Sequence, residues 1–107
     1  MASEQIDIGA REFEGRVALV TGAATGLGNV IAQEFHARGA FTVMVDQSSE
    51  VEKRASSLSS SRVLGITADL TVRKEVEEMR KEILLTCGNV DTVVNNAGRY
   101  SPVAISD

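Results

Sequence analysis

Residues 17–28, VALVTGAATGLG, decide the fold of this chain. An apolar run from Val17 to Val20 is followed at once by glycines at positions 22, 26 and 28. Uninterrupted apolar runs of this kind are typical of parallel strands that are buried on both faces. Glycine permits the sharp turn by which such a strand leaves its sheet and enters a helix. The stretch therefore predicts a buried strand, a tight loop and the start of a helix.

The rest of the chain repeats this alternation of strand and helix. Further strands are predicted at residues 40–46, 62–69 and 90–95, and helices at residues 29–39, 48–60 and 71–88. Strands that alternate with helices indicate a parallel sheet joined by crossover helices. The sequence therefore predicts an α/β fold.

Each predicted helix carries an apolar face at helical spacing. The positions are Val30, Ile31 and Phe35 in the first helix, Val51, Ala55 and Leu58 in the second, and Val72, Val76, Met79, Ile83 and Leu84 in the third. Thr71 precedes the third helix and is expected to cap its N-terminus.

Length and charge exclude several classes of function. A chain of 107 residues is long enough for one domain, which we place at residues 15–107 after a flexible lead-in at residues 1–14. The net charge of −4 argues against nucleic acid and against an anionic membrane surface as partners. No stretch approaches the roughly 20 apolar residues of a membrane span, and the lead-in lacks the features of a secretory signal.

The cysteine and histidine content bears on the redox compartment and on metal binding. Cys87 is the single cysteine, so no internal disulfide can form, and a reducing, cytoplasmic location is expected. One cysteine and one histidine far apart in the sequence give no ligand set for a metal.

Two features of the first half of the chain indicate a dinucleotide site. In a loop such as residues 22–28, backbone N–H groups can approach a pyrophosphate at the start of the helix. Asp46 ends the second predicted strand, about 20 residues beyond the glycines, where a carboxylate binds the hydroxyls of the adenosine ribose. The same carboxylate would repel a 2′-phosphate and so favours NAD over NADP. The alternatives are a tight turn without a ligand and a solvated loop acid.

Three motifs together resemble the short-chain dehydrogenase/reductase family. They are the glycine motif Thr21-Gly22-x-x-x-Gly26-Leu27-Gly28, Asp69-Leu70 after the third strand, and Asn95-Asn96-Ala97-Gly98 after the fourth. The resemblance covers residues 14 to 98, about the first two-fifths of a typical member of the family. It implies a Rossmann-type doubly wound parallel sheet, truncated after the fourth strand, with the strand order 3-2-1-4 and NAD as cofactor.

The resemblance also implies a role for each matching residue. Gly22, Gly26, Leu27 and Gly28 would lie along the pyrophosphate, Asp46 would hold the adenosine ribose, Asp69 and Leu70 would border the adenine, and Asn96, Ala97 and Gly98 would line the floor between ribose and pyrophosphate. Thr21 would form a hydrogen bond toward the asparagine turn and so tie the first strand to the fourth. Thr25 and Gln47 stand where members that prefer NADP often carry a basic residue, which also supports NAD.

The family's catalytic serine and its Tyr-x-x-x-Lys pair follow the asparagine motif, and this chain does not contain the pair. Tyr100 is the single tyrosine, and Ala104 stands four residues after it in place of a lysine. Ser101 and Ser106 have no partner base. We therefore assign no catalytic residue and expect the chain alone to be inactive.

Three functions stay open. The first is an oxidoreductase that transfers hydride between NAD and an alcohol or carbonyl substrate, with this chain as its cofactor-binding part. The second is a non-catalytic module, regulatory or otherwise, that binds an adenine dinucleotide. The third is a half-domain that pairs with a full-length relative. Because the fourth strand would form an unpaired edge, self-association through it is also expected.

Overall fold

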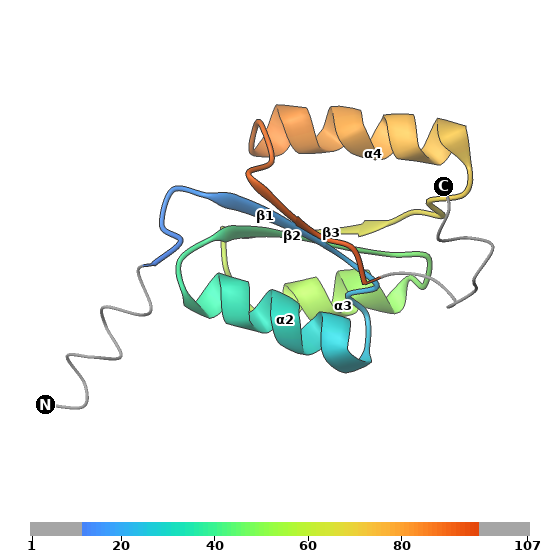
Figure 1. Ribbon diagram of the computed structural model, residues 1–107. Helices are drawn as coiled ribbons and strands as arrows, with labels where there is room; N and C mark the ends of the chain where they lie inside the picture. The colour runs from blue at the N-terminus through green and yellow to red at the C-terminus, as the bar shows by residue number, and fades with distance from the viewer. Residues whose placement is uncertain (1–11, 97–107) are drawn as a thin grey trace, which may run out of the picture.

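The computed structural model describes residues 12–96 (Figure 1). Within them, strands and helices alternate from the first element to the last. The strands are β1 (Val17–Thr21), β2 (Phe41–Asp46), β3 (Val63–Thr67) and β4 (Thr92–Val94), and the helices are α2 (Gly26–Ala37), α3 (Glu50–Ser56) and α4 (Arg73–Thr86). No helix in this part of the chain is long and apolar enough to cross a membrane. The alternation confirms the predicted α/β class.

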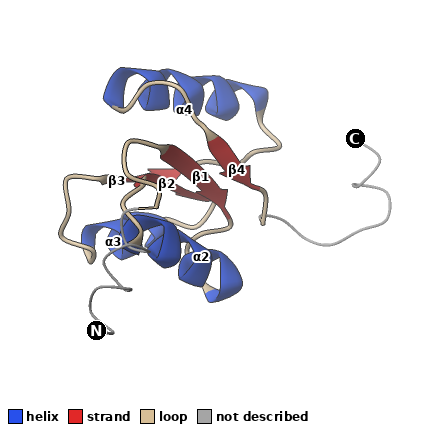
Figure 2. Ribbon diagram, turned by 60° about the vertical axis from the view of Figure 1, so that its left-hand side comes forward, coloured by secondary structure: helices blue, strands red, loops and turns tan. Residues whose placement is uncertain are grey.

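The four strands form one parallel sheet in the order β3-β2-β1-β4, as predicted. In the register of the central pair, Val17 lies opposite Phe41, and on the other side of β1, Ala18 lies opposite Thr92. Helices α2 and α3 cover one face of the sheet and α4 covers the other (Figures 1 and 2). Because all strands run the same way, their carboxyl ends meet along one edge of the sheet.

The core lies on both faces of the sheet, because neighbouring residues of a strand point in opposite directions. On the face of α2 and α3, Met44 and Val20 are fully buried in one cluster with Ala32. On the face of α4, Val43 and Ile83 belong to a second cluster. The continuous apolar run of β2 is therefore buried throughout its centre, as the sequence predicts for a parallel sheet.

Three of the apolar residues predicted on inner helix faces are instead exposed. Val30 of α2 is 60% exposed, while Ala32 is fully buried. Leu84 of α4 is exposed beside the buried Ile83. Successive residues of a helix are about 100° apart around its axis. Val30 therefore turns away from the sheet when Ala32 faces it, and Leu84 turns away when Ile83 faces it. Val72, also exposed, precedes α4 and has extended backbone angles.

The predicted cap of α4 is wrong. Val72 occupies the N-cap position, and no side chain caps the helix. The Thr71 hydroxyl instead donates a hydrogen bond of 2.7 Å to Oδ1 of Asp69, and the Thr71 N–H donates a second bond of 2.9 Å to the same oxygen. The Thr71 hydroxyl thus directs its proton to the Asp69 carboxylate, and α4 begins one residue later than a cap at Thr71 would place it. Strand β3 ends at Thr67, two residues before Asp69.

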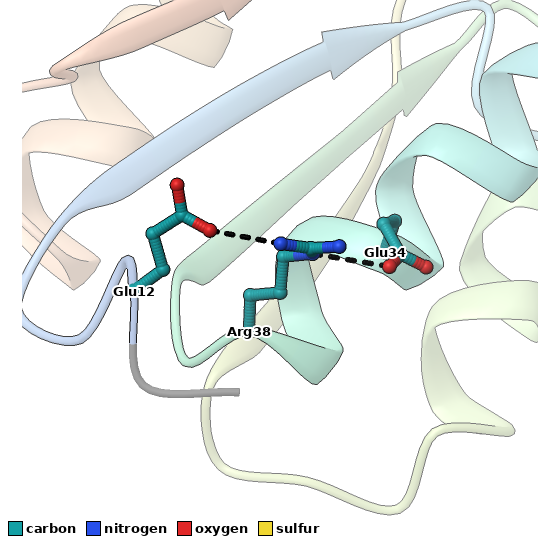
Figure 3. Close-up of polar contacts among 3 residues, drawn as sticks. All are labelled: Glu12, Glu34 and Arg38. Carbon is teal, nitrogen blue, oxygen red and sulfur yellow. Dashed lines mark hydrogen bonds and ion pairs between the residues drawn. The ribbon is translucent and has the colours of Figure 1, made fainter. Parts of the chain in front are cut away.

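The described end of the expected lead-in packs onto α2. The N–H of Phe13 donates a hydrogen bond of 2.8 Å to the carbonyl of Arg38, and the rings of Phe13 and Phe35 have centroids 5.0 Å apart. The Arg38 guanidinium forms ion pairs with Glu12 at 2.8 Å and with Glu34 at 3.1 Å (Figure 3). The packed part of the chain therefore reaches back to Glu12.

Candidate functional site

The predicted site residues gather where the carboxyl ends of the strands meet. From β1, the chain crosses through α2 to β2 on one side, and β4 lies on the other side of β1. In an open parallel sheet, this change of direction leaves a crevice at the carboxyl ends of the two strands that flank it, where ligands bind. The loop between β1 and α2, residues 22–25, lies at this point.

The glycine loop allows α2 to start close against the end of β1. Gly22 and Gly26 have φ angles of +65° and +60°, a conformation that L side chains rarely adopt. A Cβ atom on Gly28 would lie 2.0 Å from the carbonyl oxygen of Gly22 and 2.6 Å from Nδ2 of Asn96. Only glycine at position 28 therefore permits this approach of helix to strand.

The N-terminus of α2 carries no internal cap. Thr25, at the N-cap position, has extended backbone angles and its side chain makes no capping hydrogen bond. The first turn contains no acidic residue, and the Leu27 side chain is 66% exposed. The first N–H groups of a helix have no partner within the helix and bear partial positive charge. This end of α2 can therefore receive an anion.

Asp46 is fixed against the glycine loop. Its Oδ2 accepts a hydrogen bond of 3.0 Å from the N–H of Ala24, and its Oδ1 accepts one of 3.0 Å from the N–H of Ser48. Since each carboxylate oxygen has about two acceptor positions, both oxygens can still accept a hydroxyl from a ligand. The half-buried carboxylate is thus held in one orientation at the end of β2.

The asparagine turn is tied to β1 through Thr21, as predicted. The Thr21 hydroxyl accepts a hydrogen bond of 2.9 Å from the N–H of Asn96 and lies 3.1 Å from Oδ1 of Asn95. The Asn96 side chain donates a longer bond of 3.5 Å to the carbonyl of Gly22. Asn96 therefore lies beside the glycine loop. Ala97 and Gly98, the other residues predicted for this floor, lie outside the described residues.

Asp69 and Leu70 follow β3, at the far end of the same edge of the sheet. The hydroxyl and the N–H of Thr71 hold the pKa of the Asp69 carboxyl below its usual range. The N–H of Asp69 donates a hydrogen bond of 2.8 Å to Glu75 of α4. Leu70 is half-buried and packs against the core on the face of α4. Both residues thus have contacts within the fold at the position where the sequence places the adenine.

Two side chains that contact the glycine loop were not predicted from the sequence. Asn29 donates a hydrogen bond of 3.0 Å to the carbonyl of Ala23. Arg54 of α3 donates one of 3.1 Å from Nε to the carbonyl of Ala24. Asn29 lies in the glycine motif's own helix and was within reach of a sequence argument. Arg54 is 30 residues from Ala24 and sits in a charged stretch that reads as solvated surface.

Outside the glycine loop, the described residues hold no metal-binding cluster and one half-buried cysteine. Between Glu12 and Asn96, no group of three or more histidine, cysteine, aspartate or glutamate side chains could hold a metal ion. Cys87 is half-buried at the end of α4, and burial raises the pKa of its thiol, which keeps it protonated at neutral pH.

Comparison with known proteins agrees with this geometry. A family model described as short chain dehydrogenase matches residues 16–107. The meso-2,3-butanediol dehydrogenase of Serratia marcescens is 37% identical over 87 residues, which cover 80% of this chain and 35% of that protein. The NAD-dependent glycerol dehydrogenase of Listeria innocua is 35% identical over 83 residues, which cover 78% of this chain and 33% of that protein.

A solved structure gives the same result. The 3-ketoacyl-(acyl-carrier-protein) reductase from Brucella melitensis, in complex with NADH, superposes with a TM-score of 0.77 at 36% sequence identity. The match covers 81% of this chain and 36% of that one. The chain thus spans about a third of the length of each of these relatives. Because the family model covers nearly all of the described fold, the chain belongs to the short-chain dehydrogenase family.

Proposed function

We propose that residues 15–107 are the dinucleotide-binding part of an oxidoreductase of this family, with the pyrophosphate on the N-terminus of α2. The observation that carries the proposal is the close contact of Gly28 with Gly22. It brings an uncapped helix N-terminus to the carboxyl edge of the sheet, where an anion is stabilised by free N–H groups and the helix dipole. The related reductase from Brucella melitensis holds NADH, which supports a nicotinamide dinucleotide as the ligand.

The proposed cofactor is NAD rather than NADP. Asp46 would accept hydrogen bonds from the ribose hydroxyls, and its fixed negative charge would oppose a 2′-phosphate. Thr25 and Gln47, the neighbouring positions that could supply a compensating cation, are uncharged. The relative from Listeria innocua is an NAD-dependent glycerol dehydrogenase, which agrees with this choice.

The reaction proposed for the family site is hydride transfer between NAD and an alcohol or carbonyl substrate. The nicotinamide carries the hydride, and the protein binds and orients the dinucleotide. Residues 1–107 contribute no Tyr-x-x-x-Lys pair, since Ala104 follows Tyr100 at the lysine position. The role assigned to these residues is therefore to hold the adenosine and pyrophosphate, in a reducing, cytoplasmic compartment that suits the single thiol of Cys87.

Isothermal titration of the chain with ADP, NAD and NADP tests this proposal. We expect ADP and NAD to bind and NADP to bind more weakly. Asp46→Asn should weaken ADP and NAD by about tenfold or more, because a hydrogen bond to a charged group contributes about 1.5–3 kcal/mol. In the same variant, the affinities for NAD and NADP should differ less than they do in the unchanged chain.

Asp91→Asn is the matched control. Asp91 also accepts a backbone hydrogen bond, of 2.8 Å from Val17, but at the opposite end of β1. This variant should bind all three nucleotides as the unchanged chain does. A folded chain that binds neither ADP nor NAD would contradict the proposal.

A second proposal concerns association. Among the described strands, β4 pairs with β1 alone, and its central residue, Val93, is 60% exposed. An unpaired apolar edge strand can take up a strand from another chain. We therefore propose that β4 supports pairing with a second copy or with a full-length relative.

A further inference from the structure

Besides packing in the same core cluster, helix α3 is joined to the glycine loop by a hydrogen bond from the side chain of Arg54. Its Nε donates a hydrogen bond of 3.1 Å to the carbonyl oxygen of Ala24. The bond is partly buried and joins the helix that follows β2 to the loop that follows β1. Within the described residues, no other hydrogen bond or ion pair of the Arg54 side chain accompanies it.

Ala24 is held on both sides by charged groups. Its N–H donates to Oδ2 of Asp46 at 3.0 Å, and its carbonyl accepts from Arg54. The Ala24 side chain is 2% exposed and belongs to the core cluster on this face of the sheet. Two successive peptide units of the loop are therefore fixed in orientation just before the N-cap residue, Thr25.

The position of this clamp matters because α2 has no cap of its own. Thr25 makes no capping hydrogen bond, and Gly26 follows it with a φ angle of +60° and open space around its α-carbon. Glycine is conformationally free, and the carbonyl of Thr25 accepts one long hydrogen bond of 3.4 Å from the N–H of Asn29, so residues 25 and 26 restrain the first N–H groups of the helix only weakly. The restraint must come from the residues on either side, and Ala24 is the nearest fixed one.

We propose that Arg54 is a positioning residue of the nucleotide site. By holding the Ala24 carbonyl it keeps the N–H groups at the start of α2 aimed at the pyrophosphate, so that binding does not have to order the loop. This inference rests on the proposed function of the glycine loop. It assigns the effect to the hydrogen bond from Nε, not to the positive charge of the guanidinium.

Three substitutions separate the hydrogen bond from the charge. In Arg54→Gln, the side-chain amide nitrogen stands where Nε stood, so the donor is kept and the charge is lost. Arg54→Lys keeps the charge but has a methylene at that point, and Arg54→Met keeps neither. Lys53→Met is the matched control, since Lys53 is exposed on the same helix and pairs only with Glu50 at 3.7 Å.

The probe is ADP, titrated calorimetrically into each variant, with urea unfolding measured on the same samples. We expect the variants Arg54→Gln and Lys53→Met to bind ADP as tightly as the unchanged chain does. The variants Arg54→Met and Arg54→Lys should bind ADP about five- to tenfold more weakly, because each loses one hydrogen bond. If the contact only stabilised the fold, the substitutions would lower the free energy of unfolding but would not change the affinity for ADP in this order.

Two outcomes would overturn the inference. ADP binding by Arg54→Met at full affinity would show that the clamp is not needed. Full affinity in Arg54→Lys with weakened binding in Arg54→Gln would assign the effect to charge. If Arg54→Met fails to fold, the comparison of Arg54→Gln with Arg54→Lys still decides between the hydrogen bond and the positive charge. If the unchanged chain binds no ADP, the proposed function itself fails, which distinguishes that failure from this one.

Discussion

Gly28 determines how closely α2 can approach β1, and this one residue couples the fold to the site. Its missing side chain leaves room for the carbonyl of Gly22, which a Cβ atom would approach to 2.0 Å. The atom in the way belongs to the backbone, so no rotation of a side chain can relieve the contact. The helix would have to move off the strand, and the Asn96 side chain with it.

Gly28→Ala should therefore destabilise the chain by about 3 kcal/mol, the upper range for overpacking a tight contact. Gly26→Ala is the comparison, because a Cβ atom there meets nothing within 4 Å and only the positive φ angle of +60° opposes it. That variant should lower the free energy of unfolding by about 1–2 kcal/mol. Urea unfolding followed by circular dichroism measures both, and equal costs would show that the close contact is unimportant.

At this scale, the sequence predicted the residues that depend on local geometry. The glycines and Asp46 could be placed because a strand end and a helix start fix their positions along the chain. Arg54 could not, because its contact with Ala24 depends on where α3 packs after two crossovers. Asp69 shows a second limit, since the turn in which its carboxylate accepts two hydrogen bonds from Thr71 forms only in the folded chain, and α4 begins after that turn.

Among the elements, α2 contains a feature that makes its stability depend on pH. Nε2 of His36 is buried and has no hydrogen-bond partner among residues 12–96. Burial, and after it the positive charge of Arg62, lowers the pKa of His36 below its usual value of 6.5. The Arg62 guanidinium is held at this end of α2 by hydrogen bonds to the carbonyls of His36 and Ala40, at 3.3 Å and 3.0 Å.

The unfolded chain therefore binds a proton at His36 more readily than the folded chain does. The free energy of unfolding should be highest above about pH 6.5 and should fall as the pH drops through the lowered pKa of the folded state. His36→Leu should remove this part of the pH dependence, which unfolding in urea at a series of pH values would reveal. An unchanged slope in the variant would assign the pH dependence to other groups.

The elements themselves were largely predictable, and their faces were less so. Continuous apolar runs identified the strands, and glycines marked the turn after the first strand and the ends of two helices, at Gly39 and Gly88. The inner face of α2 was misjudged at Val30 because adjacent apolar residues compete for one narrow contact with the sheet. Small residues such as Ala32 fill that contact, and a search for large apolar side chains overlooks them.

For the whole molecule, the alternation of elements predicted a parallel sheet, whereas the order of its strands was implied by the resemblance to the family. The sheet that results leaves β4 with a free edge among the described strands. We expect the chain to associate at rising concentration. Val93→Lys should shift the chain toward monomer, because a lysine on an edge strand opposes pairing with another strand.

Sedimentation velocity over a range of concentrations measures this association. Lys74→Glu, an exposed charge change on α4, serves as a control that should leave the distribution unaffected. If the Val93 variant and the unchanged chain associate equally, the contact between chains does not use β4.

The most direct measurement of the central claim is a titration of the ¹⁵N-labelled chain with ADP, followed by NMR of the assigned backbone amides. If the pyrophosphate lies on the N-terminus of α2, the largest shifts should fall on Gly26, Leu27 and Gly28, with smaller ones at Ala24 and Asp46. Amides of α4 between Arg73 and Thr86 should be unaffected. Shifts centred elsewhere, or none at saturating ADP in a folded sample, would contradict the account.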